Sequence, residues 1–314
     1  MPTPVVLALD FGGTKTALAV AEADGVRLGA LTVETRAEEG AAASLSRAVE
    51  AARTLLADAA PGRELAAVGV ATLGIPGENG VALAPNIPGW GGIALGRELR
   101  RAFPGARLAL ATDVKAAAQV EADTGALAGC DPGIYVNLGT GLAIALVVGG
   151  SVVAGRNGAS GEIGYNLRRL ADVGRRPGER VPLEEAVSGG ALMLSAGRHL
   201  PPAAGPAELF AGAREHPGLA RLLADFLDEL AFHLVNLAIA VDPARIAVGG
   251  GMVRAWDLLH DRLRLALDAA VPYPPPLVPA AYPFDAPLLG ALALARGLLR
   301  TRTPVSGSEP GGRS

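Results

Sequence analysis

The first third of the chain alternates short, continuous apolar runs with glycine-containing turns. Residues 5–9 form one run, residues 10–15 (DFGGTK) form a turn, and apolar positions resume over 16–21. Runs of this length that are bounded by glycine are typical of buried strands. The same pattern predicts later strands over 29–34, 65–72 and 107–112.

Segments with helical periodicity separate these strands. Over 41–59, apolar residues recur every three or four positions, and Pro61-Gly62 ends the segment. Shorter patterns predict helices over 95–103 and 114–127. The second of these follows Asp113, which closes a predicted strand. The alternation of strands and helices indicates an α/β fold.

The second half repeats this order. Strands are predicted over 134–138 and 142–148 around the turn Gly139-Thr-Gly141, which suggests an internal duplication of a βββαβα unit. Residues 166–182 show no periodicity and predict a surface loop, and the polar residues 301–314 predict a disordered tail. The other predicted elements are helices over 183–197, 219–241, 256–270 and 288–299, a strand over 246–248, and an extended proline-rich segment over 272–283.

Composition narrows the class of protein. Half of the 314 residues are hydrophobic and 19% are charged, which excludes a disordered chain, and the length favours two domains. The sequence has no apolar run of 18 residues and no export signal, so we expect a cytoplasmic protein. The single cysteine, Cys130, excludes a disulfide framework. A net charge of −3 gives no indication of a nucleic-acid partner.

Three glycine-rich turns directly follow apolar strands, at residues 10–15, 139–141 and 249–251. Successive backbone N–H groups in such turns form anion-binding sites, so the turns are candidates for holding a polyphosphate. Neither the P-loop pattern nor the GxGxxG dinucleotide pattern is present in them. A tight hairpin explains any single turn equally well, whereas all three together with Asp10 favour nucleotide binding.

These motifs resemble those of the ROK family of sugar kinases and related repressors, over residues 5–299. Asp10-Phe-Gly-Gly-Thr-Lys15 is similar to the family's first phosphate motif, and Asn137-Leu-Gly-Thr-Gly141 is similar to its second. The segment 242–251 (DPARIAVGGG) resembles its adenosine motif. Segments that resemble its sugar-side motifs are 74–77 with 85–90, 161–164 and 183–189.

The resemblance implies a two-domain actin-like ATPase fold, which is ribonuclease H-like, with the active site in the cleft between the domains. It implies a small N-terminal α/β domain over 1–113 and a large C-terminal α/β domain over 114–287. A last helix, 288–300, would return to the first domain. A homodimer is expected by analogy alone.

The resemblance also implies a role for each motif residue. Mg²⁺ would be bound by Asp10, through water, and Lys15 would add a compact positive charge beside the phosphates. The residues expected to hold ATP are Asp10, Gly12, Gly13, Thr14, Lys15, Gly139, Thr140, Gly141, Gly249, Gly250 and Gly251. Those expected to contact the sugar are Asn86, Thr112, Asp113, Glu162, Tyr165 and Glu184.

Asp113 is the predicted catalytic base. A carboxylate at the end of a strand can project into a cleft, accept a hydrogen bond from a sugar hydroxyl and take its proton. The resemblance gives Asp113 the same role. The alternative, compatible with catalysis, is an N-cap for the following helix. For Asp10 and Asn86 the alternative is a turn residue, and for Glu162 and Glu184 it is a surface glutamate.

Three positions differ from the family pattern. Tyr165 replaces a histidine near the family's zinc module, and residues 166–182 contain neither cysteine nor histidine, so we expect no zinc site. Thr112 and Lys115 stand where asparagine is usual, and Lys115 is interpreted as a solvated residue of the first helical turn or stays unexplained. The arginines at 168, 169, 175, 176 and 180 either clamp an anionic substrate or are solvated.

The expected function is ATP-dependent phosphorylation of the primary, 6-type hydroxyl of glucose or a close analogue. The changes at 112 and 165 put glucose specificity in doubt. The replaced histidine at 165 and the missing zinc module favour, as an alternative, an aminohexose such as kanosamine or the 7-hydroxyl of a C7-cyclitol, as in antibiotic biosynthesis. A sugar-responsive repressor is disfavoured because only nine residues precede Asp10. A non-catalytic sugar sensor is disfavoured because Asp113 and the phosphate turns are intact. We expect no nucleic-acid or membrane partner.

Overall fold

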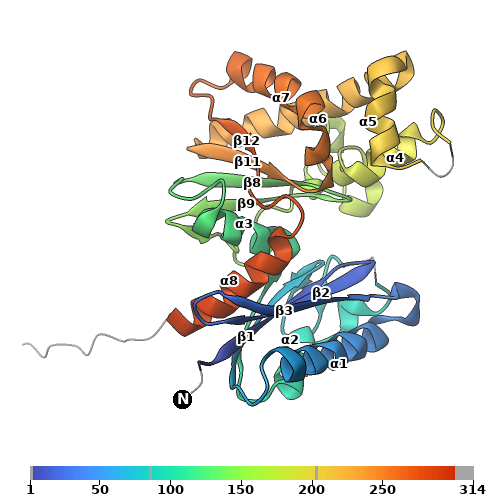
Figure 1. Cartoon of the computed structure of the whole chain (residues 1–314). Coiled ribbons are helices and arrows are strands. Elements are labelled where there is room, and N and C mark those ends of the chain that lie inside the picture. The colour runs from blue at the N-terminus through green and yellow to red at the C-terminus, as the bar shows by residue number, and fades with distance from the viewer. Residues whose placement is uncertain (1–2, 85–86, 202–203, 301–314) are drawn as a thin grey trace, which may run out of the picture.

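The computed structural model describes residues 3–84, 87–201 and 204–300. It contains a five-stranded mixed sheet in each half of the chain, with helices packed on both faces of each sheet (Figure 1). Asn86 and the predicted tail 301–314 lie outside the described residues. Among the helices of the described ranges, none combines the length and the apolarity that a membrane crossing requires.

The first sheet has the strand order β3-β2-β1-β4-β7. The β3-β2-β1 strands pair antiparallel, and β1, β4 and β7 run parallel. Phe11 lies beside Thr72, and Thr72 lies beside Thr112, so the three parallel strands end at one edge of the sheet, where Asp10 and Asp113 are placed. The strands are β1 (Val5–Phe11), β2 (Lys15–Glu22), β3 (Arg27–Glu34), β4 (Leu65–Thr72) and β7 (Arg107–Thr112).

The second sheet has the order β10-β9-β8-β11-β12. Its strands β8 and β11 run parallel, with Asn137 beside Gly249, so the glycine turns that follow these strands lie at the same edge. The strands are β8 (Gly133–Leu138), β9 (Leu142–Val148), β10 (Ser151–Val152), β11 (Arg245–Gly249) and β12 (Leu277–Pro279). A separate hairpin is formed by β5 (Ile75–Pro76) and β6 (Val81–Ala82).

Helices cover both faces of the first sheet because its buried strands are apolar on both sides. Val5 of β1 packs in a core with α1 and α2, whereas its neighbour Val6 packs against α8. Gly69 of β4 permits the close approach of α8, since a Cβ there would lie 1.8 Å from the carbonyl oxygen of Ala291. The last helix therefore packs on the first sheet, while the domain boundaries at 113 and 287 stay a prediction. The helices are α1 (Ala41–Ala59), α2 (Leu95–Ala102) and α8 (Ala286–Arg300).

The second sheet is covered in the same way. Ile246 of β11 packs in a core with α6 and α7, and the next residue, Ala247, packs with α3 on the opposite face. The helices of this half are α3 (Asp113–Thr124), α4 (Gly189–Ala196), α5 (Pro206–Glu215), α6 (Pro217–Val241) and α7 (Trp256–Ala270). The short 3₁₀ helices are η1 (Ala37–Glu39), η2 (Trp90–Gly92), η3 (Ile163–Tyr165), η4 (Leu170–Asp172), η5 (Pro177–Glu179), η6 (Leu183–Glu185) and η7 (Gly251–Ala255).

The prediction of one helix over 183–197 is wrong. The segment breaks into η6 and α4 because Ser188 adopts an extended conformation and caps α4, its Oγ accepting a hydrogen bond from the N–H of Ala191 at 3.1 Å. The predicted helix 114–127 begins at Asp113 and ends earlier, at Thr124, before Gly125. Helix α5 had no counterpart among the predicted elements, and β12 lies within the segment predicted to be extended.

Candidate active site

A cleft of about 1380 Å³ is lined by residues from both halves of the chain. The first half contributes Lys15, Leu73 and Gly74, next to strands β2 and β4. The second half contributes the glycine turns that follow β8 and β11. The cleft also receives five of the six residues predicted to contact the sugar: Thr112, Asp113, Glu162, Tyr165 and Glu184. Asn86, the sixth, lies outside the described residues.

Asp10 and Asp113 form an acidic pair at the edge of the first sheet. Burial, followed by the charge of Asp113, raises the pKa of Asp10 to about 7, while the charge of Lys15 opposes this shift. Burial also raises the pKa of Asp113, although its Oδ1 accepts a hydrogen bond from the N–H of Val114 at 2.8 Å. Interacting carboxylates with shifted pKa values, one of which lines the cleft, are typical of a reactive site.

Thr112 is the N-cap of α3, with its Oγ1 accepting a hydrogen bond from the N–H of Lys115 at 3.2 Å. The cap therefore lies one residue before Asp113, which occupies the first helical position. Because Thr112 provides the cap, the Asp113 carboxylate bonds only locally to Val114 and faces the cleft. Thr112 also lines the cleft, so capping and substrate contact are both open to it.

Lys115 is buried, with 6% of its surface exposed, so the interpretation of a solvated residue is wrong. Its Nζ lies 3.9 Å from Oε1 of Glu162. Burial lowers the pKa of Lys115, and the nearby carboxylates of Glu162 and Asp113 oppose that shift. Burial raises the pKa of Glu162, which Lys115 opposes in turn. The lysine thus compensates the negative charge of Glu162 and Asp113.

The second glycine turn, residues 139–141, is held by a hydrogen bond within the turn and by hydrogen bonds from the start of α4. Gly139 donates its N–H to the carbonyl of Gly141 at 3.2 Å, which closes the turn. At the start of α4, Gly189 donates to the carbonyl of Gly139 at 2.8 Å, and Gly190 donates to the carbonyl of Thr140 at 3.1 Å. A Cβ at Gly189 would lie 2.5 Å from the Gly139 oxygen, so this contact requires glycine. In the sequence, Gly189 was indicated only by its place in the segment 183–189, which resembles a sugar-side motif of the family.

Glu184 links the second glycine turn to Asp113 and Glu162. Its Oε2 accepts a hydrogen bond from the N–H of Leu142 at 2.8 Å, directly after Gly141. The side chain also lines the cleft and raises the pKa of Asp113 and of Glu162 by its charge. Glu184 is exposed, as its alternative of a surface glutamate expects, and it also lines the cleft and holds the turn.

The third glycine turn approaches the second. Gly250 has a φ of +87°, and a Cβ there would lie 2.5 Å from the carbonyl group of Leu138. Gly250 and Gly251 line the cleft, whereas Gly249 packs against the ring of Tyr135 as the last residue of β11. Of the first turn, Lys15 lines the cleft, and the N–H of Gly12 donates to the Lys15 carbonyl at 3.0 Å. Gly13 and Thr14 lie between them.

Tyr165 is placed at the mouth of the cleft by the arginine-containing loop. Arg180 donates from Nη2 to the Tyr165 carbonyl at 2.5 Å and from Nη1 to the Asn166 carbonyl at 3.0 Å. Arg168 forms a two-point ion pair with Glu229 of α6. Arg168 and Arg180 both bind groups of the protein itself. Neither of the two predicted roles, an anion clamp or a solvated arginine, therefore applies to them. Arg169, Arg175 and Arg176 are exposed.

The donor set suits Mg²⁺ bound through Asp10. Magnesium prefers one or two carboxylates and retains several waters, and Asp10 supplies a carboxylate whose charge interacts with that of Asp113. Within the described ranges, no group of three or more His, Cys, Asp or Glu side chains is close enough together to hold a metal ion.

The arrangement of two α/β halves around a cleft with glycine turns from both is that of an actin-like ATPase fold. The family model of the ROK family matches residues 6–297. The chain therefore belongs to the ROK family.

Three comparisons illustrate the likeness. The chain is 28% identical to a glucokinase from Thermotoga maritima, covering 94% of this chain and 98% of the relative. It is 32% identical to a kanosamine kinase from Amycolatopsis mediterranei, covering 94% and 97%. A ROK glucokinase from Streptomyces griseus, solved with glucose and AMPPNP, superposes with a TM-score of 0.73 at 26% identity, covering 93% and 99%.

Proposed function

We propose that the protein is an ATP-dependent sugar kinase that transfers the γ-phosphate to the primary, 6-type hydroxyl of glucose or a close hexose analogue. The observation that carries the proposal is the position of Asp113. It directly follows β7 and lines one cleft together with Lys15, Glu162 and Glu184 and with residues of the second and third glycine turns. Phosphoryl transfer needs a base at such a junction.

In the proposed reaction, the Asp113 carboxylate accepts a hydrogen bond from the sugar hydroxyl and takes its proton as the oxygen attacks the γ-phosphorus. The new oxygen–phosphorus bond forms while the bond from the γ-phosphorus to the β–γ bridging oxygen breaks, and ADP leaves. The raised pKa of Asp113 suits this role because it makes the carboxylate a better proton acceptor than an exposed aspartate.

The nucleotide is assigned to the glycine turns and Lys15. The second and third turns line the cleft with residues 139–141, Gly250 and Gly251, and Lys15 lines it from the first turn. Their free backbone N–H groups are assigned to the phosphates and the ribose side, Lys15 adds positive charge, and Gly12, Gly13, Thr14 and Gly249 are assigned from their motifs. When bound at Asp10, Mg²⁺ supplies further neutralisation of phosphate charge. The AMPPNP in the Streptomyces griseus glucokinase supports ATP as the donor.

The sugar is assigned to the carboxylates on the other side of Asp113. Glu162 and Glu184 accept hydrogen bonds from sugar hydroxyls, and Thr112 and Tyr165 complete the contacts. Asn86 is assigned to the same group from its sequence motif. Tyr165 is 40% exposed at the cleft, so it has room to adjust to the substrate.

A second substrate class is an aminohexose such as kanosamine, or a C7-cyclitol carrying the 7-hydroxyl. The kanosamine kinase relative supports the first of these. The three carboxylates Asp113, Glu162 and Glu184 favour a cationic amino group, although Lys115 compensates one of them. Values of kcat/KM for glucose, kanosamine and a valiolone-type cyclitol separate the options. A clear preference for glucose would exclude the second class.

We further propose a cytoplasmic homodimer without a zinc site. ATP as a substrate supports the location. Phe232 and Ile239, seven residues apart on α6, are 60% and 51% exposed and offer an apolar surface for a second copy. Sedimentation of the purified protein tests the dimer, and a metal assay on the same sample tests the absence of zinc. A DNA shift assay with and without sugar tests the disfavoured repressor.

A further inference from the structure

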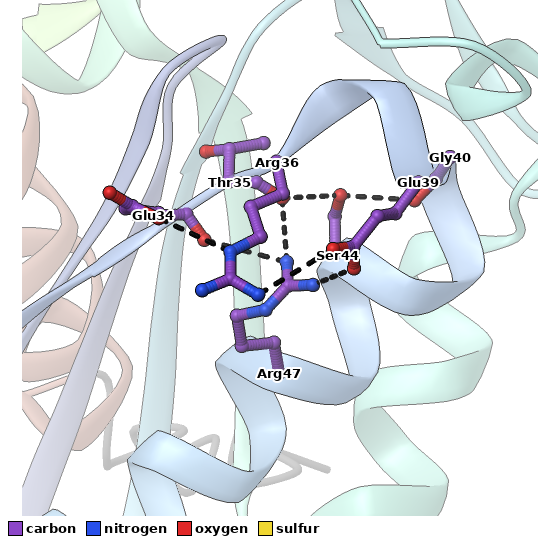
Figure 2. Close-up of polar contacts among 7 residues, drawn as sticks. All are labelled: Glu34, Thr35, Arg36, Glu39, Gly40, Ser44 and Arg47. Atoms are coloured by element: carbon purple, nitrogen blue, oxygen red, sulfur yellow. Dashed lines mark hydrogen bonds and ion pairs between the residues drawn. The ribbon is translucent and has the colours of Figure 1, made fainter.

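A cluster of seven polar-contact residues lies where β3 passes into α1, and we call it the Thr35 cluster (Figure 2). Thr35 is at its centre and is 1% exposed. A buried threonine needs partners for its hydroxyl and its backbone groups. The cluster consists of Glu34, Thr35, Arg36, Glu39, Gly40, Ser44 and Arg47.

Thr35 forms two hydrogen bonds with the first glycine turn. Its hydroxyl donates to the carbonyl oxygen of Gly12 at 2.7 Å. Its backbone N–H donates to the carbonyl oxygen of Thr14 at 2.9 Å. One residue thus holds two of the carbonyl groups within the turn that is assigned to the nucleotide phosphates.

These two bonds fix the direction of the N–H groups that follow. In a planar trans peptide, the carbonyl and the next N–H point in opposite directions. Because the Gly12 and Thr14 carbonyls point toward Thr35, the N–H groups of Gly13 and Lys15 point away from it. An anion is bound by N–H groups that are held in a common orientation before it arrives.

The backbone carbonyl of Thr35 is itself held by hydrogen bonds from helix α1. It accepts a hydrogen bond from Arg47 Nη1 at 2.7 Å, and the Ser44 hydroxyl lies 2.8 Å away as a second donor (Figure 2). Arg47 in turn pairs with Glu39. Both donors come from α1, so the helix acts as a rigid support for Thr35.

The backbone is strained at Arg36, where the chain passes from Thr35 toward α1. Arg36 has a φ of 48°, in the left-handed region that non-glycine residues rarely adopt. Its guanidinium pairs with Glu34 at 3.2 Å and with Glu39 at 3.6 Å, which holds the bend (Figure 2). The bend carries the chain from β3 into the support helix directly after Thr35.

The same helix end contacts the loop on the sugar side. The N–H of Ala41, the first residue of α1, donates to the carbonyl of Pro88 at 2.9 Å. The Ser44 hydroxyl also lies 3.0 Å from the carbonyl of Gly40. The start of α1 therefore supports both the nucleotide turn, through Thr35, and the loop that contains Pro88.

We propose that Thr35 is a positioning residue for the nucleotide, which orients the 12–15 turn for the phosphates by holding the Gly12 and Thr14 carbonyls. The assignment of that turn to ATP rests on the proposed function. Thr35 touches no reacting atom, so its removal acts on nucleotide binding and leaves sugar binding in place.

The test compares Thr35→Val, which removes the hydroxyl, with Thr35→Ser, which retains it. Thr32→Val on the exposed side of β3 is the matched control. Calorimetry with AMPPNP and Mg²⁺ measures nucleotide binding directly. A second titration measures the binding of the sugar that the parent protein prefers. We expect Thr35→Val to weaken AMPPNP binding roughly tenfold, the size of one lost buried hydrogen bond. Thr35→Ser and Thr32→Val should stay within about twofold of the parent protein, and sugar binding should not change.

Equal AMPPNP affinity in Thr35→Val and the parent protein would overturn the inference, as would equal losses in the Val and Ser variants or an equal loss of sugar binding. If Thr35→Val does not fold, Ser44→Ala replaces it, with an expected loss of about threefold because Arg47 still holds the Thr35 carbonyl. If the parent protein binds AMPPNP but phosphorylates no sugar, the proposed function fails. The AMPPNP affinities of the Thr35 variants still test the role of Thr35 in that case.

Discussion

The ammonium group of Lys115 lies 3.9 Å from the carboxylate of Glu162, and the charge of this lysine lowers the pKa of both Glu162 and Asp113 against the effect of burial. The lysine is buried at a position two residues after the proposed base. A nearby positive charge favours the ionised form of a carboxyl group, which is the form that accepts a proton, and so it opposes the effect of burial on Asp113 and Glu162.

Replacing Lys115 by Met should therefore move the pH dependence of the reaction. The charge of Lys115 lowers the pKa of Asp113 and of Glu162, so its loss raises both. The base works only when deprotonated, so activity in the variant should be lost at a higher pH as the solution is acidified. The acidic limb of kcat/KM against pH measures this shift.

Lys115→Arg provides the control for charge, and its acidic limb should stay near that of the parent protein. The groups that face Lys115 or its partners are Asp113, Glu162 and Glu184, and all of them are kept in both variants. An unchanged acidic limb in Lys115→Met would show that the lysine is only a packing residue.

Asp113→Asn should remove the proton acceptor without removing the cleft. The asparagine side chain keeps an oxygen for Val114 but cannot take a proton at neutral pH. We expect kcat to fall by roughly 10²- to 10⁴-fold, the usual contribution of a general base. Calorimetry with AMPPNP should show unchanged nucleotide affinity. Activity at the parent level would contradict the assigned role.

Gly189→Ala should disturb the second glycine turn from the start of α4, where Gly189 lines the cleft. The added Cβ would lie 2.5 Å from the Gly139 carbonyl oxygen, so the turn or α4 must shift. A misplacement of this kind should lower kcat/KM for ATP by roughly 10- to 100-fold. Gly178→Ala is the control, since a Cβ there meets no atom within 4 Å. Similar kinetics in the two variants would show that the turn tolerates the shift.

Arg180→Met should loosen the segment that carries Tyr165. It removes the two hydrogen bonds to the Tyr165 and Asn166 carbonyls, and a lysine at 180 cannot replace the planar fork. We expect the KM for the sugar to rise roughly tenfold, as for the loss of one or two hydrogen bonds, with the KM for ATP unchanged. Arg175→Met, at an exposed arginine of the same loop, should match the parent protein. A parallel rise in both KM values would indicate general damage instead.

Much of this structure is predictable from local sequence. Strands 65–72 and 107–112 and the helix 256–270 follow their patterns to the residue, because buried apolar runs and helical periodicity are local signals. The helix predicted at 183–197 is wrong because Ser188 favours a cap over a continuous helix, a choice that packing against the second glycine turn reinforces.

The site is predictable only in part. The resemblance to the family's motifs was enough to predict that Asp113, Glu162 and Glu184 line one cleft. The burial of Lys115 and the use of Arg180 as a support could not be predicted, since both depend on groups 47 and 15 residues away, respectively. Thr35 had no motif of its own, and its role follows from contacts with a turn more than 20 residues earlier.

The most direct test of the proposed function is to follow the γ-phosphate of ATP by ³¹P NMR in the presence of glucose, kanosamine or a C7-cyclitol. The account predicts that one of these becomes a phosphate ester at its primary hydroxyl, with ADP formed in equal amount and no transfer by Asp113→Asn. ATP hydrolysis to free phosphate without any ester, or an ester formed equally well by Asp113→Asn, would contradict it.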